Sequence, residues 1–319
     1  MAEWLVEQGI GEERAILLHD GEAIAAATIW DDGLQPGLIA DAVLVHRARG
    51  ASRGTARFRD GEEALVDRLP PATPEGGRIR LEVTRPALGE AGRRKLARAR
   101  PSEEAIRPPP RLAERLGGRL VHRFPGTIWD ELLAEAFAGT IDFPGGALVL
   151  HATPAMVLID VDGPLPASAL AAAAVTPLAG AVRRLDLGGA IGIDFPTLAT
   201  KDQRRVVDSA LDAALAGWPH ERTAMNGFGF VQLVSRLERV SLLHRAQLQP
   251  AASAARWLLR RAEGLEGAGA IHLACHPVVA ALLRPEWLDE LARRSGRMVQ
   301  VGADARLAIT APHAQMIPR

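Results

Sequence analysis

The spacing of apolar and polar residues predicts short strands in the first quarter of the chain. Apolar runs flank the turn His19-Asp20-Gly21, an arrangement typical of a β-hairpin because Asp-Gly tolerates positive φ. Further strands, separated by glycine-containing turns, are expected at residues 41–45, 55–58, 63–66 and 78–83. Strands this short and closely spaced favour a small barrel or sandwich. We therefore expect a β unit over residues 1–36 and a second β region over residues 37–86.

From residue 124 the pattern changes to alternating helices and strands. Helices are expected at 127–138 and 200–216, each with a threonine at its start that can cap free backbone N–H groups. Val206 is expected to face inward with the other apolar residues of the second helix. A long helix is expected at 167–187, where Pro177 should start a new segment or kink the helix. Strands are expected at 146–151, 157–163 and 189–195, and a helical pattern at 231–240.

This pattern predicts an α/β domain over residues 124–240 and a small αβ domain over residues 241–319. In the second of these, helices are expected at 251–262, 277–283 and 286–294, and strands at 270–274 and 298–301.

Two of the predicted strands end in acidic residues. They are the runs Val157-Leu158-Ile159-Asp160-Val161-Asp162 and Gly189-Ala190-Ile191-Gly192-Ile193-Asp194, on either side of one helix. Neighbouring parallel strands joined by a crossover have this separation, so the carboxylates are expected at adjacent strand ends. Carboxylate oxygens suit Mg²⁺ or Mn²⁺ better than zinc, and such an ion can activate water at a phosphoryl centre. The alternative is that the aspartates only end strands and cap helices.

A basic band lies between Arg85 and Arg123. It holds eleven basic and four acidic residues, a net charge of +7, in a chain whose 38 basic and 38 acidic residues cancel. Pro101 and the prolines at 108–110 interrupt the band, so a surface linker is expected over residues 87–123. The arginines could contact a phosphate backbone, or they could belong to a solvated linker. Aromatic residues, which a stacking platform for single strands needs, are nearly absent nearby.

Composition narrows the class of protein. The 319 residues suffice for two or three domains, and 48% of them are hydrophobic. Cys275 is the only cysteine, which excludes a disulfide framework and fits a reducing cytoplasm. His272, Cys275 and His276 form no zinc spacing, and a core strand ending in a turn is the preferred interpretation. Without a signal pattern or an apolar run of about 18 residues, we expect a cytoplasmic protein with no membrane partner.

A longer motif surrounds the second acidic strand. Residues 182–195 are V-R-R-L-D-L-G-G-A-I-G-I-D-F, which resembles the signature of the ribonuclease E/G family, typically written L-R-L-R-D-L-G-G-I-I-V-I-D-F. The preceding I-D-V-D-G at 159–163 is similar to that family's I-D-V-N-S. Weaker matches are Phe143-Pro144-Gly145-Gly146 to L-P-S-G-G, Gln203-Arg204 to the helix after the second Asp, and Phe228-Gly229 to F-G-L.

The resemblance implies a DNase I-like α/β catalytic domain, preceded by a degenerate OB-type barrel, that cuts single-stranded RNA internally and leaves a 5′-phosphate. The family's two aspartates hold one Mg²⁺ ion and match Asp160 and Asp194, with Mn²⁺ as an alternative ion. Asp162 stands where the family has Asn and is a supporting catalytic candidate. The candidates for RNA contact are Arg93, Arg94, Lys95, Arg98, Arg100, Arg123, Asn226 and Arg236.

The chain also departs from the family. The 5′-sensor insertion, most of an RNase H-like subdomain and the Cys-Pro-x-Cys zinc link have no counterpart, so neither a structural zinc nor a zinc-linked dimer is expected. These observations predict a short, metal-dependent endoribonuclease. Two alternatives stay open: an RNA-binding protein that has lost activity, and a metal-dependent phosphodiesterase that acts on DNA or small nucleotides.

Overall fold

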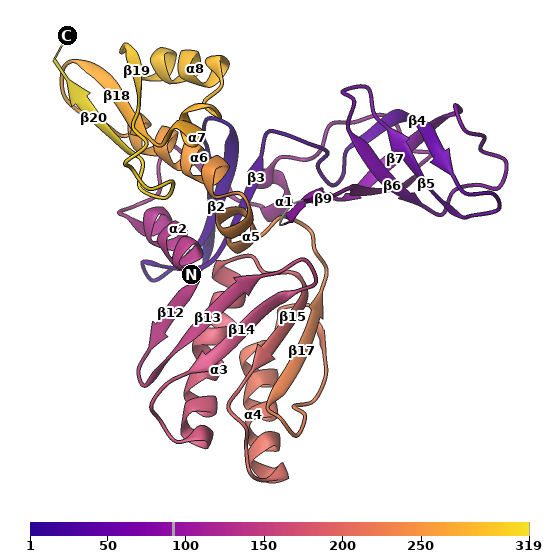
Figure 1. Cartoon of the computed structure of the whole chain (residues 1–319), viewed down its shortest axis with the longest axis vertical. Coiled ribbons are helices and arrows are strands. Elements are labelled where there is room, and N and C mark those ends of the chain that lie inside the picture. Colours follow the sequence, from indigo (N-terminus) through magenta and orange to yellow (C-terminus); the bar gives the residue numbers. More distant parts are fainter. Residues whose placement is uncertain (91–92, 319) are drawn as a thin grey trace.

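The computed structural model describes residues 1–90 and 93–318, apart from the side chains of Glu90 and Arg93. Figure 1 shows an N-terminal sheet, a barrel set to one side, a larger α/β sheet below and a small C-terminal unit above. Within the described residues, no helix combines the length and the apolar character needed to cross a lipid bilayer.

The N-terminal sheet has the strand order β11-β1-β2-β3. Its strands are β1 (Glu3–Gln8), β2 (Glu12–His19), β3 (Glu22–Trp30) and β11 (Arg119–Val121). The predicted hairpin is confirmed, because β2 and β3 pair antiparallel around Asp20 and Gly21, whose φ angles are 50° and 87°. Positive φ at both central residues is the requirement of a two-residue hairpin turn. Strand β11 pairs parallel to β1, so the chain returns to this sheet after the barrel.

Five strands close into a barrel in the order β10-β6-β5-β4-β7. They are β4 (Ile39–Arg47), β5 (Arg53–Arg57), β6 (Glu63–Asp67), β7 (Arg78–Arg85) and β10 (Ala97–Pro101). The barrel core includes Leu44, Phe58 and Leu81. Of the two architectures that the strand spacing favoured, a barrel and a sandwich, the chain therefore forms the barrel.

The linker predicted over residues 87–123 contains ordered elements instead. Strand β10 completes the barrel, with Ala97 and Ala99 buried and Arg98 and Arg100 exposed. The same stretch holds β11, the antiparallel hairpin of β8 (Leu88–Glu90) and β9 (Arg93–Lys95), and helix α1 (Leu112–Leu116). The alternation of small apolar and basic residues at 97–100 is the period-two pattern of a strand, which a count of charges along the band does not reveal.

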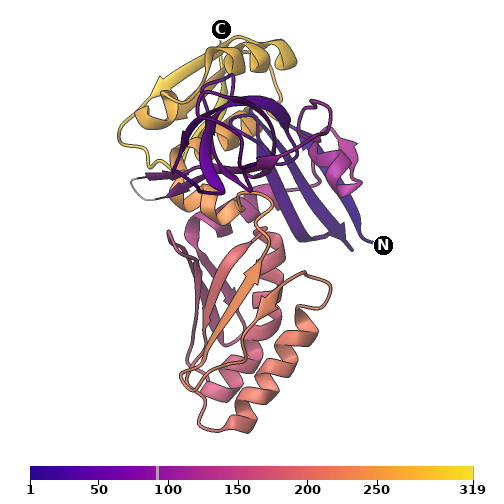
Figure 2. The same cartoon turned by 90° about the vertical axis from the view of Figure 1, so that its right-hand side faces the viewer.

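The largest sheet has six strands in the order β12-β13-β14-β15-β17-β16. They are β12 (Thr140–Phe143), β13 (Gly146–Ala152), β14 (Val157–Asp162), β15 (Gly189–Asp194), β16 (Glu221–Arg222) and β17 (Phe230–Ser235). Helix α3 (Ala167–Arg184) connects β14 to its parallel neighbour β15, and α4 (Lys201–Ala214) follows β15. Figure 2 shows both helices on one face of the sheet. The side chains of Leu158 and Val234, 41% and 49% exposed, mark the other face as open to solvent.

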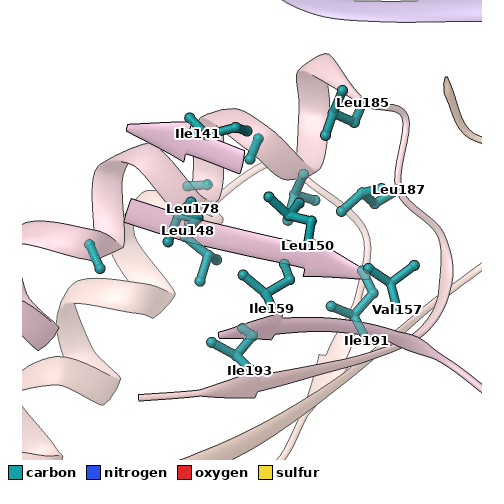
Figure 3. Close-up of a cluster of buried hydrophobic side chains, with 14 of the residues drawn as sticks. Ile141, Leu148, Leu150, Val157, Ile159, Leu178, Leu185, Leu187, Ile191 and Ile193 are labelled. Carbon is teal, nitrogen blue, oxygen red and sulfur yellow. The ribbon is translucent and has the colours of Figure 1, made fainter. Parts of the chain in front are cut away.

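The helix-covered face forms the main core. Residues along β14 alternate between buried and exposed, so Ile159 faces the helices. It packs in one cluster with Leu178 of α3 and with Ile191 and Ile193 of β15 (Figure 3). Burial of each such side chain contributes roughly 1.5–3 kcal/mol. Helices α2 (Ile128–Ala138) and α5 (Leu242–Leu248) extend the same cluster toward the N-terminal sheet.

Two local predictions in this region were wrong, and one alternative of a third is excluded. Pro177 lies inside one continuous helix, α3, so it does not start a new segment. Residues 230–235 form strand β17 where a helix was expected, since pairing with β15 overrides the weak helical spacing of their apolar residues. Val206 is 66% exposed on α4, because the neighbouring Val207 and Leu211 occupy the buried side of that helix.

The C-terminal unit is a three-stranded sheet with the order β19-β18-β20. Its elements are α6 (Pro250–Glu263), β18 (Ala270–Cys275), α7 (Pro277–Ala280), α8 (Pro285–Ser295), β19 (Val299–Ala303) and β20 (His313–Ile317), of which β20 was not predicted. Cys275 is buried in the core of this unit. His272 lies against Gly302 of β19, and His276 accepts a bond from the backbone N–H of Val278 at 3.2 Å. The three residues therefore play separate structural parts.

Candidate functional site

Asp160 and Asp194 lie side by side on the parallel strands β14 and β15. They are register partners, so their Cα atoms are about 4.8 Å apart, the spacing between neighbouring strands. Register partners point to the same face of a sheet, and both aspartates are exposed on the face opposite α3 and α4. The structure brings together the two carboxylates that the sequence placed at adjacent strand ends.

Two further aspartates share this face. Asp162 follows Asp160 by two residues and points the same way. Asp142 of β12 and Asp162 are both register partners of Ala147, and both are exposed. One oxygen of Asp162 accepts the backbone N–H of Gly163 at 2.9 Å, which fixes the carboxylate at the strand end. We call Asp142, Asp160, Asp162 and Asp194 the acidic face.

The carboxylates of Asp160 and Asp194 form no hydrogen bond or ion pair with any described residue. Like charges on directly opposed residues destabilise a sheet, so this pair carries a cost that a bound cation would remove. Among the described residues, no group of three or more His, Cys, Asp and Glu side chains is arranged to hold a metal. A hydrated Mg²⁺ ion needs only one or two carboxylates because it keeps several waters and shares substrate oxygens. The two carboxylates therefore suit a hydrated Mg²⁺ ion, whereas the described side chains do not supply a complete set of protein ligands.

An aromatic ring lies next to the acid pair. Phe230 of β17 is the register partner of Asp194, so Asp160, Asp194 and Phe230 form one row across three strands. A Cβ at Gly192 would come within 2.6 Å of Phe230 Cζ and 3.0 Å of Met156 Sδ, so the ring covers that position of β15. The ribonuclease signature has Val at this position and Leu after F-G. This chain has the smaller Gly192 in place of that Val on β15 and the larger Phe230 in place of that Leu on β17.

A turn at residues 226–229 lies beside the end of β15. The side-chain oxygen of Asn226 accepts the backbone N–H groups of Phe228 and Phe230 at 2.9 and 3.1 Å. The carbonyl of Gly229 accepts the N–H of Phe195 at 3.2 Å. Asn226, a candidate for RNA contact, is therefore close to Asp194, but its carbonyl oxygen is used to fix the turn.

A partly buried ion pair secures the other end of β15. Arg239 donates from Nε and Nη2 to the two carboxylate oxygens of Asp186, each at 2.8 Å. Asp186 directly precedes the Leu187-Gly188 entry into β15, and Arg239 follows β17, so the pair joins the ends of two neighbouring strands. Burial raises the pKa of the Asp186 carboxyl above its usual value, in opposition to the Arg239 charge. Asp186 lies within the motif at 182–195, but the motif did not indicate this structural role.

Five arginines of the basic band form ion pairs with acids, and four of these acids lie outside the band. Arg94 pairs with Glu62 at 3.3 Å, Arg100 with Glu82 at 2.7 Å and Arg111 with Glu13 at 2.6 Å. Arg107 pairs with Glu104 and Arg119 with Glu3. The charge of +7 counted acids within the band only, whereas most of these partners are remote in sequence. The band is therefore a much weaker polyanion surface than its composition suggests.

The remaining basic candidates lie at several places. Lys95 donates to the carbonyl of Pro154 at 3.4 Å, where β13 turns into β14. Arg98 is exposed on the barrel, and the side chain of Arg93 lies outside the described residues. Arg123 donates to the carbonyl of Arg260 at 3.3 Å, at the C-terminal unit.

Arg236 is also separated from the acid pair. It follows the end of β17, six residues beyond Phe230, which corresponds to about 20 Å of extended chain. There it lines a cavity of about 240 Å³ together with Asp186 and Arg239. The structure thus gathers the acidic candidates and Asn226 and leaves Arg123 and Arg236 away from them.

Comparison with protein-family models gives no match for this chain, and comparison with curated proteins gives none either. The resemblance to the ribonuclease E/G family therefore rests on the motif residues themselves and on where they lie in the fold.

Proposed function

We propose that this protein is a metal-dependent endoribonuclease that hydrolyses single-stranded RNA and leaves a 5′-phosphate. The observation that carries the proposal is the register pairing of Asp160 and Asp194 on the open face of the sheet, where neither carboxylate has a partner among the described residues. The ordered motif resemblance around both strands supports the same function and a DNase I-like class for the domain.

Asp160 and Asp194 would hold one Mg²⁺ ion, with Mn²⁺ as an alternative, on their outward oxygens. When bound, this ion supplies positive charge to the phosphodiester and makes water a stronger nucleophile. Water oxygen forms a bond to phosphorus while the bond from phosphorus to the 3′-oxygen breaks, and the 3′-oxygen takes up a proton. Asp162, fixed through Gly163, keeps a second oxygen available beside the pair as a proton acceptor.

RNA should bind to the acidic face only when a cation is present, because both carry negative charge. Four carboxylates on one face repel a polyanion in the absence of divalent ions, and three of the arginines that could offset them, Arg94, Arg100 and Arg119, are paired with acids. RNA binding should therefore depend on Mg²⁺. An RNA-binding protein without catalysis, which relies on its barrel and basic band, would bind RNA equally well after chelation.

The test is cleavage of an internally labelled single-stranded RNA in Mg²⁺. Wild type should cut it to 5′-phosphate products, and Asp194→Asn should lose roughly a hundredfold or more of the rate, as expected when a metal ligand is removed. Asp202→Asn is the matched control, because Asp202 is an exposed aspartate at the start of α4. No cleavage by wild type in Mg²⁺ or Mn²⁺ would refute the proposal, and preferential cleavage of DNA or of a mononucleotide diester would point to the phosphodiesterase.

A further inference from the structure

Phe228 has an unusual degree of exposure. Its side chain is 81% exposed, whereas other aromatic residues such as Trp30 and Phe58 are 3% and 5% exposed. Of the chain's Phe and Trp residues, all of which the structure describes, Phe228 alone is in the exposed class. A phenyl ring in water forgoes the stabilisation that burial would give it, so its exposure calls for a physical reason.

The turn fixes the backbone of Phe228. Besides the two bonds that Asn226 accepts, the hydroxyl of Thr197 donates to the carbonyl of Phe228 at 3.2 Å. Gly229 has a φ of 95°, and a Cβ there would collide with the carbonyl oxygen of Phe195. The backbone of Phe228 is thus fixed to the segment that directly follows Asp194, so little backbone freedom is lost when the ring makes a contact.

The ring has open space around it. Gly227 and Gly229 flank it in sequence, and a Cβ at Gly227 would meet no atom within 4 Å. Both neighbours lack side chains, so the turn presents a single ring and no apolar patch of the kind that a protein partner would bury. A flat, isolated ring beside a row of carboxylates suits a ligand that has a planar group and carries phosphate groups with bound cations.

The barrel offers no substitute for such a contact. Its Phe58 belongs to the barrel core, and the outward residues of β10 are arginines. Proteins that bind single strands use aromatic side chains on which bases stack. In this chain the exposed ring lies at the acid pair and away from the barrel.

We propose that Phe228 is a substrate-binding residue that stacks on a nucleobase next to the phosphodiester held at Asp160 and Asp194. This inference rests on the proposed ribonuclease function and adds the way in which the strand is positioned. Stacking fixes the nucleotide beside the scissile bond, so it should contribute to the affinity for RNA and to kcat/KM, with little dependence on which base is present.

Binding is measured with Mg²⁺ and an RNA analogue that cannot be hydrolysed, so that both metal ligands stay in place, and kcat/KM is measured with the cleavable RNA. Phe228→Ala should weaken binding about 5- to 100-fold and lower kcat/KM by a similar factor, whereas Phe228→Trp should retain both. Phe228→Leu, which keeps apolar surface without a π face, should resemble Phe228→Ala. The control is Val206→Ala, because Val206 is another exposed apolar side chain, 66% exposed on α4.

A series of RNA oligonucleotides with one abasic nucleotide locates the stacked base. At one position beside the cleaved bond, removal of the base should weaken binding to the Phe228 protein and leave binding to Phe228→Ala unchanged. Equal binding and cleavage by Phe228→Ala and by the Phe228 protein would overturn the stacking role while the ribonuclease function stands. Full rescue by Phe228→Leu would also overturn it. If wild type neither binds nor cuts RNA, both proposals fail together.

Discussion

Neutralisation of Asp186 should destabilise the protein through the arginine that it leaves behind. Asp186→Asn keeps the size of the side chain and tolerates the φ of 51° at this position, as Asn is one of the residues that adopt the left-handed region. It removes the carboxylate that accepts two bonds from Arg239. Loss of one partner from a fully buried ion pair costs about 3–5 kcal/mol.

The cost at this site should be smaller. The side chains of Arg239 and Asp186 are 13% and 18% exposed, and Glu238 lies 3.4 Å from Arg239 Nη1. We therefore expect Asp186→Asn and Arg239→Met each to lower the free energy of unfolding by about 2–3 kcal/mol. The double variant should lose only about 1–3 kcal/mol, because it leaves no unpaired charge and avoids the desolvation that raises the pKa of Asp186.

Urea unfolding followed by circular dichroism at neutral pH measures these differences. Glu3→Gln is the control, since Glu3 and Arg119 form a pair whose side chains are 52% and 59% exposed, and exposed pairs contribute about 1 kcal/mol or less. Additive losses in the double variant, or single losses below about 0.5 kcal/mol, would show that the pair does not secure β15.

Two further predictions concern the turn and the N-terminal sheet. Gly229→Ala should cost about 2 kcal/mol or more of stability and should lose most of the RNA cleavage. Gly227→Ala, with open space around its Cβ, should match wild type in thermal unfolding and in cleavage. Similar behaviour of the two variants would argue against a fixed turn. Burial alone would raise the pKa of Glu7, but its bonds to Arg260 and its closeness to Arg14 bring the pKa below the usual 4.5. Since the folded value is the lower one, this stabilisation is complete above the unfolded pKa and is lost as pH falls through the folded pKa. Glu7→Gln should therefore be less stable at neutral pH and lose less stability on acidification, and parallel urea midpoints against pH for both proteins would contradict this.

The sequence predicted the elements that depend on local chemistry. The Asp20-Gly21 hairpin, the Thr200 cap of α4 and the strands that carry Asp160 and Asp194 all follow from turn residues, caps and apolar runs. Strand β17 was missed because its short apolar run fits either period, and only its pairing with β15 decides between them. The alternation at 97–100 carried the signal for β10, but the charge count obscured it.

The site was predictable in part for the same reason. Strand order placed the aspartates together, since a crossover helix joins parallel neighbours. The partners of the arginines were not predictable: Glu13 and Arg111 are 98 residues apart in the chain, and nothing local indicates that they meet. The Phe230 and Gly192 contact could have been suspected from the glycine between Ile191 and Ile193, because a glycine inside a strand often marks a close approach.

The open face of the large sheet also limits how a polymer could reach the acid pair. A site inside a tunnel or a closed pocket must be entered by a chain end, and it measures length from that end. The acidic face has helices behind it and solvent in front (Figure 2), so a strand can be laid across it sideways at any internal position. An enzyme built in this way would cleave a long RNA at internal positions, and its cleavage would not depend on the ends of that RNA.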